Sequence, residues 1–167
     1  MIRVLLAATL SPLYGIYSGY ELCENQALPD REEYLDSEKY QFKKRDWNAP
    51  GNIKDWIARL NRIRKQNRSL QLYTNLRFYP AENEAILFYS KMTPARDNII
   101  LVVVNLDPHR KQHSFVDVPI EQFGQMESDQ YKVQDLLSGA TYTWRGRRNY
   151  VELDPEVQPA HIFLVRR

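Results

Sequence analysis

The second half of the chain alternates between apolar and polar residues with a period of two. From about Leu70 onward, short runs rich in β-branched and aromatic residues carry this alternation. Turn-forming pairs such as Asp107-Pro108 and Ser138-Gly139 separate the runs. The predicted strands are 76–79, 85–90, 99–105, 115–119, 131–136, 141–144, 150–153 and 162–165. Because 99–104 is almost unbroken apolar sequence, the pattern predicts an antiparallel β-sandwich.

Ahead of these strands the apolar residues recur at three- and four-residue steps, which is the spacing of an amphipathic helix. Asn52 is placed to cap this helix, and Asp55 occupies a favourable position in its first turn. The predicted buried face is formed by Ile53, Trp56, Ile57, Leu60 and Ile63.

The N-terminal part is less regular. Residues 1–10 are typical of the end of a helix, and the apolar stretch Tyr14–Leu22 predicts a short strand buried on both faces. The polar stretch Cys23–Gly51 is then a long loop, of a length usually found in functional or mobile segments. A lone strand between two helices indicates a fragment of an α/β architecture, because parallel strands need neighbours on both sides. We therefore expect the partners of this strand to lie outside the chain.

Composition narrows the class of protein only modestly. The 167 residues are 43% hydrophobic and 26% charged with a net charge of +2, which is globular and gives no reason to expect nucleic acid or an anionic membrane as partner. The single cysteine, Cys23, excludes an intrachain disulfide and favours a reducing, cytoplasmic setting. The N-terminal apolar run continues through Pro12 rather than ending in a cleavage site, and it is too short to span a bilayer.

Six sequence blocks, in order, resemble one family. They are "YGIYSGYELCEN" from Tyr14, "EEYLDSEKYQ" from Glu32, "RDW" from Arg45, "NIILVVVNLDP" from Asn98, "DLLSG" from Asp135 and "RRNYVELDPEVQPAHIF" from Arg147. They are similar to the C-terminal part of the bacterial maltosyltransferases that use α-maltose 1-phosphate, within the α-amylase superfamily of glycoside hydrolases. The resemblance implies a mainly β chain: residues 1–69 would be the last strand, loop and helix of an incomplete (β/α)8 barrel, and residues 70–167 the β-sandwich.

The resemblance also implies an activity. Such enzymes move maltosyl units from α-maltose 1-phosphate to the non-reducing ends of α-1,4-glucans with retention of configuration, without a cofactor or metal, and members are homodimeric. This chemistry requires a nucleophilic carboxylate, an acid for the leaving phosphate and a further acid near the oxocarbenium-like transition state. In the family these acids follow earlier barrel strands, so we expect no catalytic residue in this chain and no activity of the chain alone.

Lys39 and Tyr40, in Ser37-Glu-Lys-Tyr40, are the candidate substrate-binding residues. On composition alone, a lysine and a tyrosine in a charged loop are ordinary solvated residues. In the family, however, the matching pair contacts the phosphate of maltose 1-phosphate. A compact mobile charge and a rigid hydroxyl donor suit phosphate oxygens.

Glu21 and Glu24 are the acids that could replace the missing catalytic ones, since both follow the predicted barrel strand. Fully extended chain would place them at most about 10 Å apart, against about 5 to 5.5 Å in a retaining pair. A bent loop would allow the shorter distance, but a structural interpretation is favoured, in which Glu21 forms hydrogen bonds at the barrel rim and Glu24 is solvated.

The remaining candidates have simpler structural explanations. His109 and His113 have a metal-like spacing but fall on a turn and a strand, so exposed histidines are expected, and His161 is expected to be structural. The basic cluster Arg145, Arg147 and Arg148, beside Trp144 and Tyr150, could stack on sugars or bases. A solvated hairpin with one inward-facing aromatic residue is the favoured interpretation.

Two functional hypotheses of different class follow. In the first, the chain is the C-terminal portion of a maltosyltransferase and supplies one active-site loop and a supporting sandwich. In the second, it is a stand-alone non-catalytic β-sandwich that binds α-glucan or stabilises a partner. The genomic sequence upstream of Met1 distinguishes them, because only the first hypothesis predicts that it encodes the remaining barrel.

Overall fold

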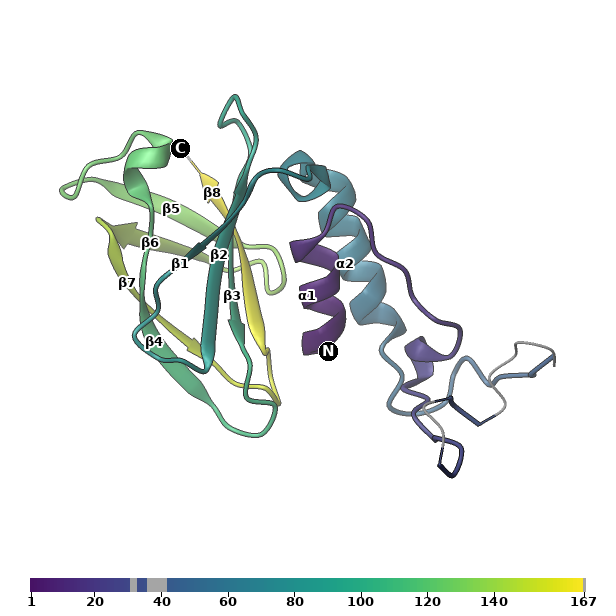
Figure 1. The fold of residues 1–167 in the computed structure, drawn as a ribbon. Helices are drawn as coiled ribbons and strands as arrows, with labels where there is room; N and C mark the ends of the chain where they lie inside the picture. The colour runs from purple at the N-terminus through teal and green to yellow at the C-terminus, as the bar shows by residue number, and fades with distance from the viewer. Residues whose placement is uncertain (31–32, 36–41, 167) are drawn as a thin grey trace. The chain divides into compact units, whose positions relative to one another are not determined.

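The computed structural model describes residues 1–30, 33–35 and 42–166. Its residues form two compact units, one made of Met1–Tyr14 with Arg59–Arg167 and the other of Gly15–Ala58. The larger unit contains both β-sheets, and the smaller unit contains the segment that carries the predicted substrate loop (Figure 1).

Two helices flank the smaller unit in sequence, as predicted. α1 spans Ile2–Leu10, and α2 spans Lys54–Gln66, where Asn52 Oδ1 accepts a hydrogen bond from the backbone N–H of Lys54 at 3.4 Å. Within the larger unit, α1 contacts β3 and buries Val4, Leu5 and Ala8. Arg64 of α2 donates hydrogen bonds to the carbonyls of Ala8, Ser11 and Pro12, so it binds the otherwise unpaired C-terminal end of α1.

All eight predicted strands are present, and every strand pair is antiparallel. One sheet has six strands in the order β1-β2-β3-β8-β5-β6, and the other pairs β4 with β7. The bounds are β1 Leu76–Tyr79, β2 Ile86–Met92, β3 Ile99–Asn105, β4 Gln112–Asp117, β5 Gln130–Asp135, β6 Thr141–Arg145, β7 Arg148–Leu153 and β8 Ala160–Arg166.

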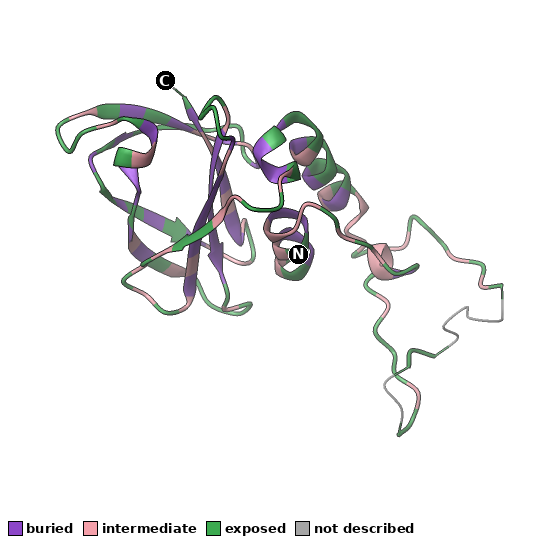
Figure 2. Ribbon diagram, turned by 45° about the horizontal axis from the view of Figure 1, so that its top comes forward, coloured by how far each residue is buried: buried purple, intermediate pink, exposed green. Residues whose placement is uncertain are grey.

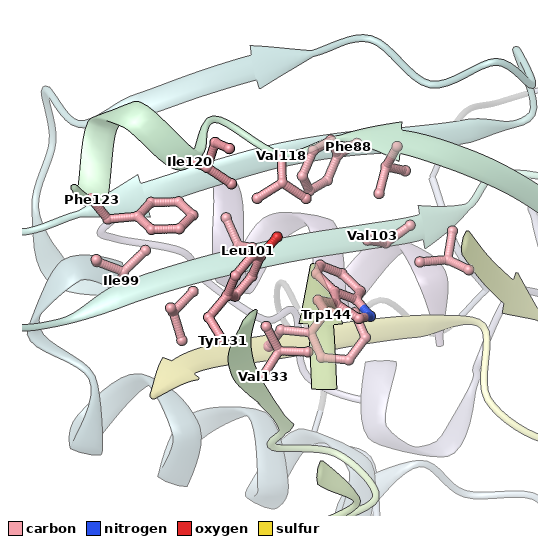
Figure 3. Packing of buried hydrophobic residues seen from close by; sticks show 14 of the residues in the cluster. Phe88, Ile99, Leu101, Val103, Val118, Ile120, Phe123, Tyr131, Val133 and Trp144 are labelled. Atoms are coloured by element: carbon pink, nitrogen blue, oxygen red, sulfur yellow. The ribbon is translucent and has the colours of Figure 1, made fainter. Parts of the chain in front are cut away.

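The main core contains residues of both sheets, and Figure 3 shows part of it; the predicted mainly antiparallel β character is confirmed. Leu101 and Val103 of β3, Val133 of β5 and Trp144 of β6 face Val151 of β7 across this core. Every residue of β3 is buried, because the opposite face of that strand is covered by α1 (Figure 2). The unbroken apolar run at 99–104 therefore reflects a strand that is buried on both faces.

The predicted strand at Tyr14–Leu22 is wrong. Its residues pair with no strand, and Tyr20–Leu22 form a short 3-10 helix, η1, between left-handed Gly19 and Cys23. Apolar character predicted burial there, but a strand also needs a neighbouring edge, and none of the described residues supplies one. Two further 3-10 helices, η2 (Arg68–Gln71) and η3 (Ile120–Phe123), were not predicted.

Candidate functional site

The predicted substrate residues Lys39 and Tyr40 lie outside the described residues. The structure does describe the segments on both sides of them. Ala27 and Tyr34 form an isolated antiparallel bridge, supported by backbone hydrogen bonds from Leu28 N to Glu33 O and from Leu35 N to Gln26 O, both 2.8 Å. The Tyr34 ring also packs edge-on against Tyr17, with centroids 6.5 Å apart. We call the described residues 17–35 and 42–47 the loop stem.

Glu24 joins the two halves of the loop stem. Its carboxylate accepts a two-point hydrogen bond from Arg45, with Nε 3.1 Å from Oε1 and Nη2 3.2 Å from Oε2, and a further one from Lys43 Nζ at 3.3 Å. The hydrogen bond from Arg45 is the largest influence that lowers the pKa of Glu24. The prediction that Glu24 is simply solvated is therefore wrong: it is the common partner of two cations.

Gly19 lies directly against the Glu24 carboxylate of this ion cluster. The residue has a φ of +93°, and a Cβ at this position would overlap the Glu24 carboxylate. A side chain here would therefore both strain the backbone and displace the carboxylate from Arg45.

Glu21 behaves differently from Glu24. Its backbone carbonyl accepts a hydrogen bond from Ile53 N at 2.8 Å, whereas its side-chain Oε2 is buried without a hydrogen-bond partner among the described residues. Such an atom is costly to leave unpaired. Among the described residues, Oε2 therefore does not form the side-chain hydrogen bonds that were expected at the barrel rim.

The structure separates the three histidines as expected. His109 and His113 are exposed, and no group of three or more potential metal ligands occurs among the described residues. His161 is structural: its Nδ1 lies 3.1 Å from Oδ2 of the fully buried Asp135.

Asp135 is the centre of a polar network that the sequence analysis missed. Its carboxylate accepts hydrogen bonds from the backbone N–H groups of Leu137, Ser138 and Ile162, and from the side chains of Ser138, Gln158 and His161. Burial alone would raise the pKa of this carboxyl, but the hydrogen bonds outweigh burial and lower the pKa to about 2. An aspartate at the end of a strand, just before Ser138-Gly139, was the only local signal, because Gln158 and His161 are distant in sequence.

The basic cluster is the expected solvated hairpin. Trp144 is buried in the sandwich core, while Arg147 pairs with Glu121 and Arg148 pairs with Glu82. The Arg148 guanidinium also lies 3.5 Å from the centre of the Phe115 ring. These contacts with the protein occupy Trp144, Arg147 and Arg148, three of the residues that were considered for stacking on sugars or bases.

Lys91 was not singled out from the sequence, yet it is fully buried on β2. Its Nζ has no hydrogen-bond partner among the described residues. Desolvation lowers its pKa, and repulsion from Arg64 adds to this effect.

The fold is shared with α-amylases. A Geobacillus thermoleovorans α-amylase matches 98% of this chain and 32% of its own length, with a TM-score of 0.65 at 16% identity. A maltogenic α-amylase from Thermotoga neapolitana matches 100% of this chain and 36% of its own, with a TM-score of 0.67 at 14% identity. The likeness shows that the chain shares the fold of part of each of these two enzymes.

Sequence comparison identifies the family. The family model described as "GLGE, C-terminal" matches residues 78–165, and the chain belongs to this family. Similar proteins include α-1,4-glucan:maltose-1-phosphate maltosyltransferases from Rhodospirillum rubrum, 53% identical over 99% of this chain, and from Pseudomonas aeruginosa, 45% identical over 100% of it. The chain spans 24% and 25% of the length of these relatives.

Among the described residues, none of the helices has the length and apolar character required to cross a membrane.

Proposed function

We propose that this chain is the C-terminal part of a maltosyltransferase that transfers maltosyl units from α-maltose 1-phosphate to the non-reducing ends of α-1,4-glucans. The observation that carries the proposal is the 53% identity to a maltosyltransferase along 99% of the chain. Residues 1–69 then belong to the end of the catalytic barrel and residues 70–167 form the C-terminal sandwich. The α-amylase fold and the buried, unpaired Oε2 of Glu21 support this division, because a barrel would offer that atom a donor.

In this account the segment contributes to substrate binding rather than to bond cleavage. Lys39 and Tyr40 bind the phosphate of α-maltose 1-phosphate, and the Glu24–Arg45–Lys43 cluster fixes the ends of the loop that carries them. The three carboxylates required for a retaining reaction lie on preceding barrel strands. The single cysteine supports a reducing, cytoplasmic setting for the whole enzyme.

Replacement of the phosphate-binding residues tests this proposal. In the longer enzyme that carries this segment, Lys39→Ala should raise the KM for α-maltose 1-phosphate about tenfold or more, because a charge-assisted hydrogen bond contributes about 1.5–3 kcal/mol. Tyr40→Phe should have a smaller effect in the same direction. Lys44→Ala, a lysine in the same segment, is the matched control and should leave KM unchanged. Unchanged kinetics in both Lys39→Ala and Tyr40→Phe would contradict the assignment.

A further inference from the structure

A surface cleft lies where the starts of β6 and β8 approach the end of β7. It has a volume of about 320 Å³ and is lined by residues from both sheets and from the connections between strands. Tyr142 comes from the start of β6 and His161 from the start of β8, whereas Glu152 lies near the end of β7. The connections between strands complete the lining with Lys111, Ser138, Asp154, Val157 and Gln158. The volume suits a ligand of about one or two sugar rings.

Tyr142 gives the cleft a preformed aromatic wall. Its ring is 42% exposed, yet it packs edge-on against Phe163, with centroids 5.9 Å apart, and against His161 at 6.3 Å. Phe163 in turn belongs to the sandwich core. Because these neighbours already hold the Tyr142 ring, little side-chain conformational entropy is lost when a ligand stacks on it.

The buried Asp135 fixes the polar groups of the same cleft. The two amide hydrogens of Gln158 are taken by Asp135 at 2.7 Å and by the Ala160 carbonyl at 2.8 Å, which leaves the proton on His161 Nδ1 for Asp135. Neither Oε1 of Gln158 nor Nε2 of His161 has a hydrogen-bond partner within the described part of the chain. Oε1 of Gln158 is therefore an acceptor held in a fixed position on the cleft lining, and Nε2 of His161 is a second polar atom held there.

The charged residues that line the cleft disfavour an anionic ligand. The charged lining residues are Glu152, Asp154 and Lys111, and Lys111 already pairs with Glu152 at 2.7 Å. One lysine against two carboxylates leaves a net charge of −1. A lining dominated by acceptors needs a ligand that brings several donors without negative charge, and an apolar face for Tyr142. A pyranose ring, with its C–H face and its rim of hydroxyl groups, meets each requirement.

We propose that this cleft is a non-catalytic binding site for a glucosyl unit of an α-glucan chain, with Tyr142 stacking on the ring, Gln158 and Glu152 accepting hydrogen bonds from its hydroxyls, and His161 Nε2 forming a further hydrogen bond. The choice of an α-glucan rests on the proposed function, since that polymer is the proposed acceptor. The site holds the polymer on the sandwich and takes part in no bond cleavage.

Titration of the 167-residue chain with maltoheptaose, followed by amide chemical shifts, tests the inference. Shifts should cluster at residues 138–142 and 152–161, and Tyr142→Ala should weaken binding about tenfold. Tyr142→Phe keeps the ring and should retain most of the affinity. Tyr73→Ala removes an exposed tyrosine between η2 and β1 that does not line the cleft, and this variant should bind like the unaltered chain.

Three results would overturn the inference: no clustered shifts with millimolar maltoheptaose, equal loss of affinity in Tyr142→Ala and Tyr73→Ala, or shifts at the cleft with inorganic phosphate but not with maltoheptaose. The amide spectrum of each variant also reports whether it is folded. Because this readout is binding to the 167-residue chain, its failure leaves maltosyl transfer by the longer enzyme untouched. Conversely, if the longer enzyme transferred no maltosyl units, binding of maltoheptaose to the 167-residue chain would still support the proposed cleft.

Discussion

At the scale of single residues, Asp135 has the strongest predicted effect on stability. It is fully buried and accepts hydrogen bonds from two strand connections and from β8. Asp135→Ala leaves several buried donors without an acceptor and should lower the free energy of unfolding by about 3–5 kcal/mol. Asp117→Ala, at an exposed aspartate on β4, should change it by no more than about 0.5 kcal/mol. Urea denaturation near pH 7 measures both values, and equal values would contradict the role of Asp135.

The difference in stability between the unaltered chain and Asp135→Ala should also depend on pH. The pKa of Asp135 is about 2 in the folded chain, against an ordinary value of 3.8, so its ionisation stabilises the fold above about pH 4. This contribution, about 2 kcal/mol, is lost as the pH falls from about 4 to about 2. Over that range the stability gap between the unaltered chain and Asp135→Ala should therefore shrink, and a constant gap would argue that the carboxylate is not held ionised.

At the scale of elements, the two units should differ in local stability. β3 is buried on both faces, whereas Tyr14–Leu22 forms no strand pairing. Amide hydrogen exchange in the 167-residue chain should therefore be slow at Val102, Val103 and Val104 and fast throughout Tyr14–Leu22. Comparable protection in the two segments would contradict this division.

The strands could be predicted from the sequence because the alternation of apolar and polar residues within each strand reflects which of its side chains are buried. The bounds of β1 and β3 match the prediction, while β4 begins earlier than expected, at Gln112, because polar residues such as the buried Ser114 conceal its start. Tyr14–Leu22 could not be predicted in the same way, because its apolar residues report a need for burial but do not identify what covers them. The Asp135 network was also hidden, since its partners meet only when β5 and β8 pair.

At the scale of the whole molecule, the chain combines a well-defined sandwich with a loop stem. Lys39 and Tyr40 became candidates only through resemblance to a family, because a lysine beside a tyrosine carries no physical signal of phosphate binding by itself. The loop stem shows how Glu24 holds Arg45 and Lys43 next to that loop. The chain spans 24% of its Rhodospirillum rubrum relative, and we propose that maltosyl transfer requires the remaining part of such an enzyme.

Phosphate release from α-maltose 1-phosphate, with glycogen as acceptor, is the most direct test of that claim. The assay compares the 167-residue chain with the same chain extended at its N-terminus to the length of its relatives. We predict release only from the longer protein, matched by maltosyl units added to glycogen. Release by the 167 residues alone, or none from the longer protein, would contradict the account.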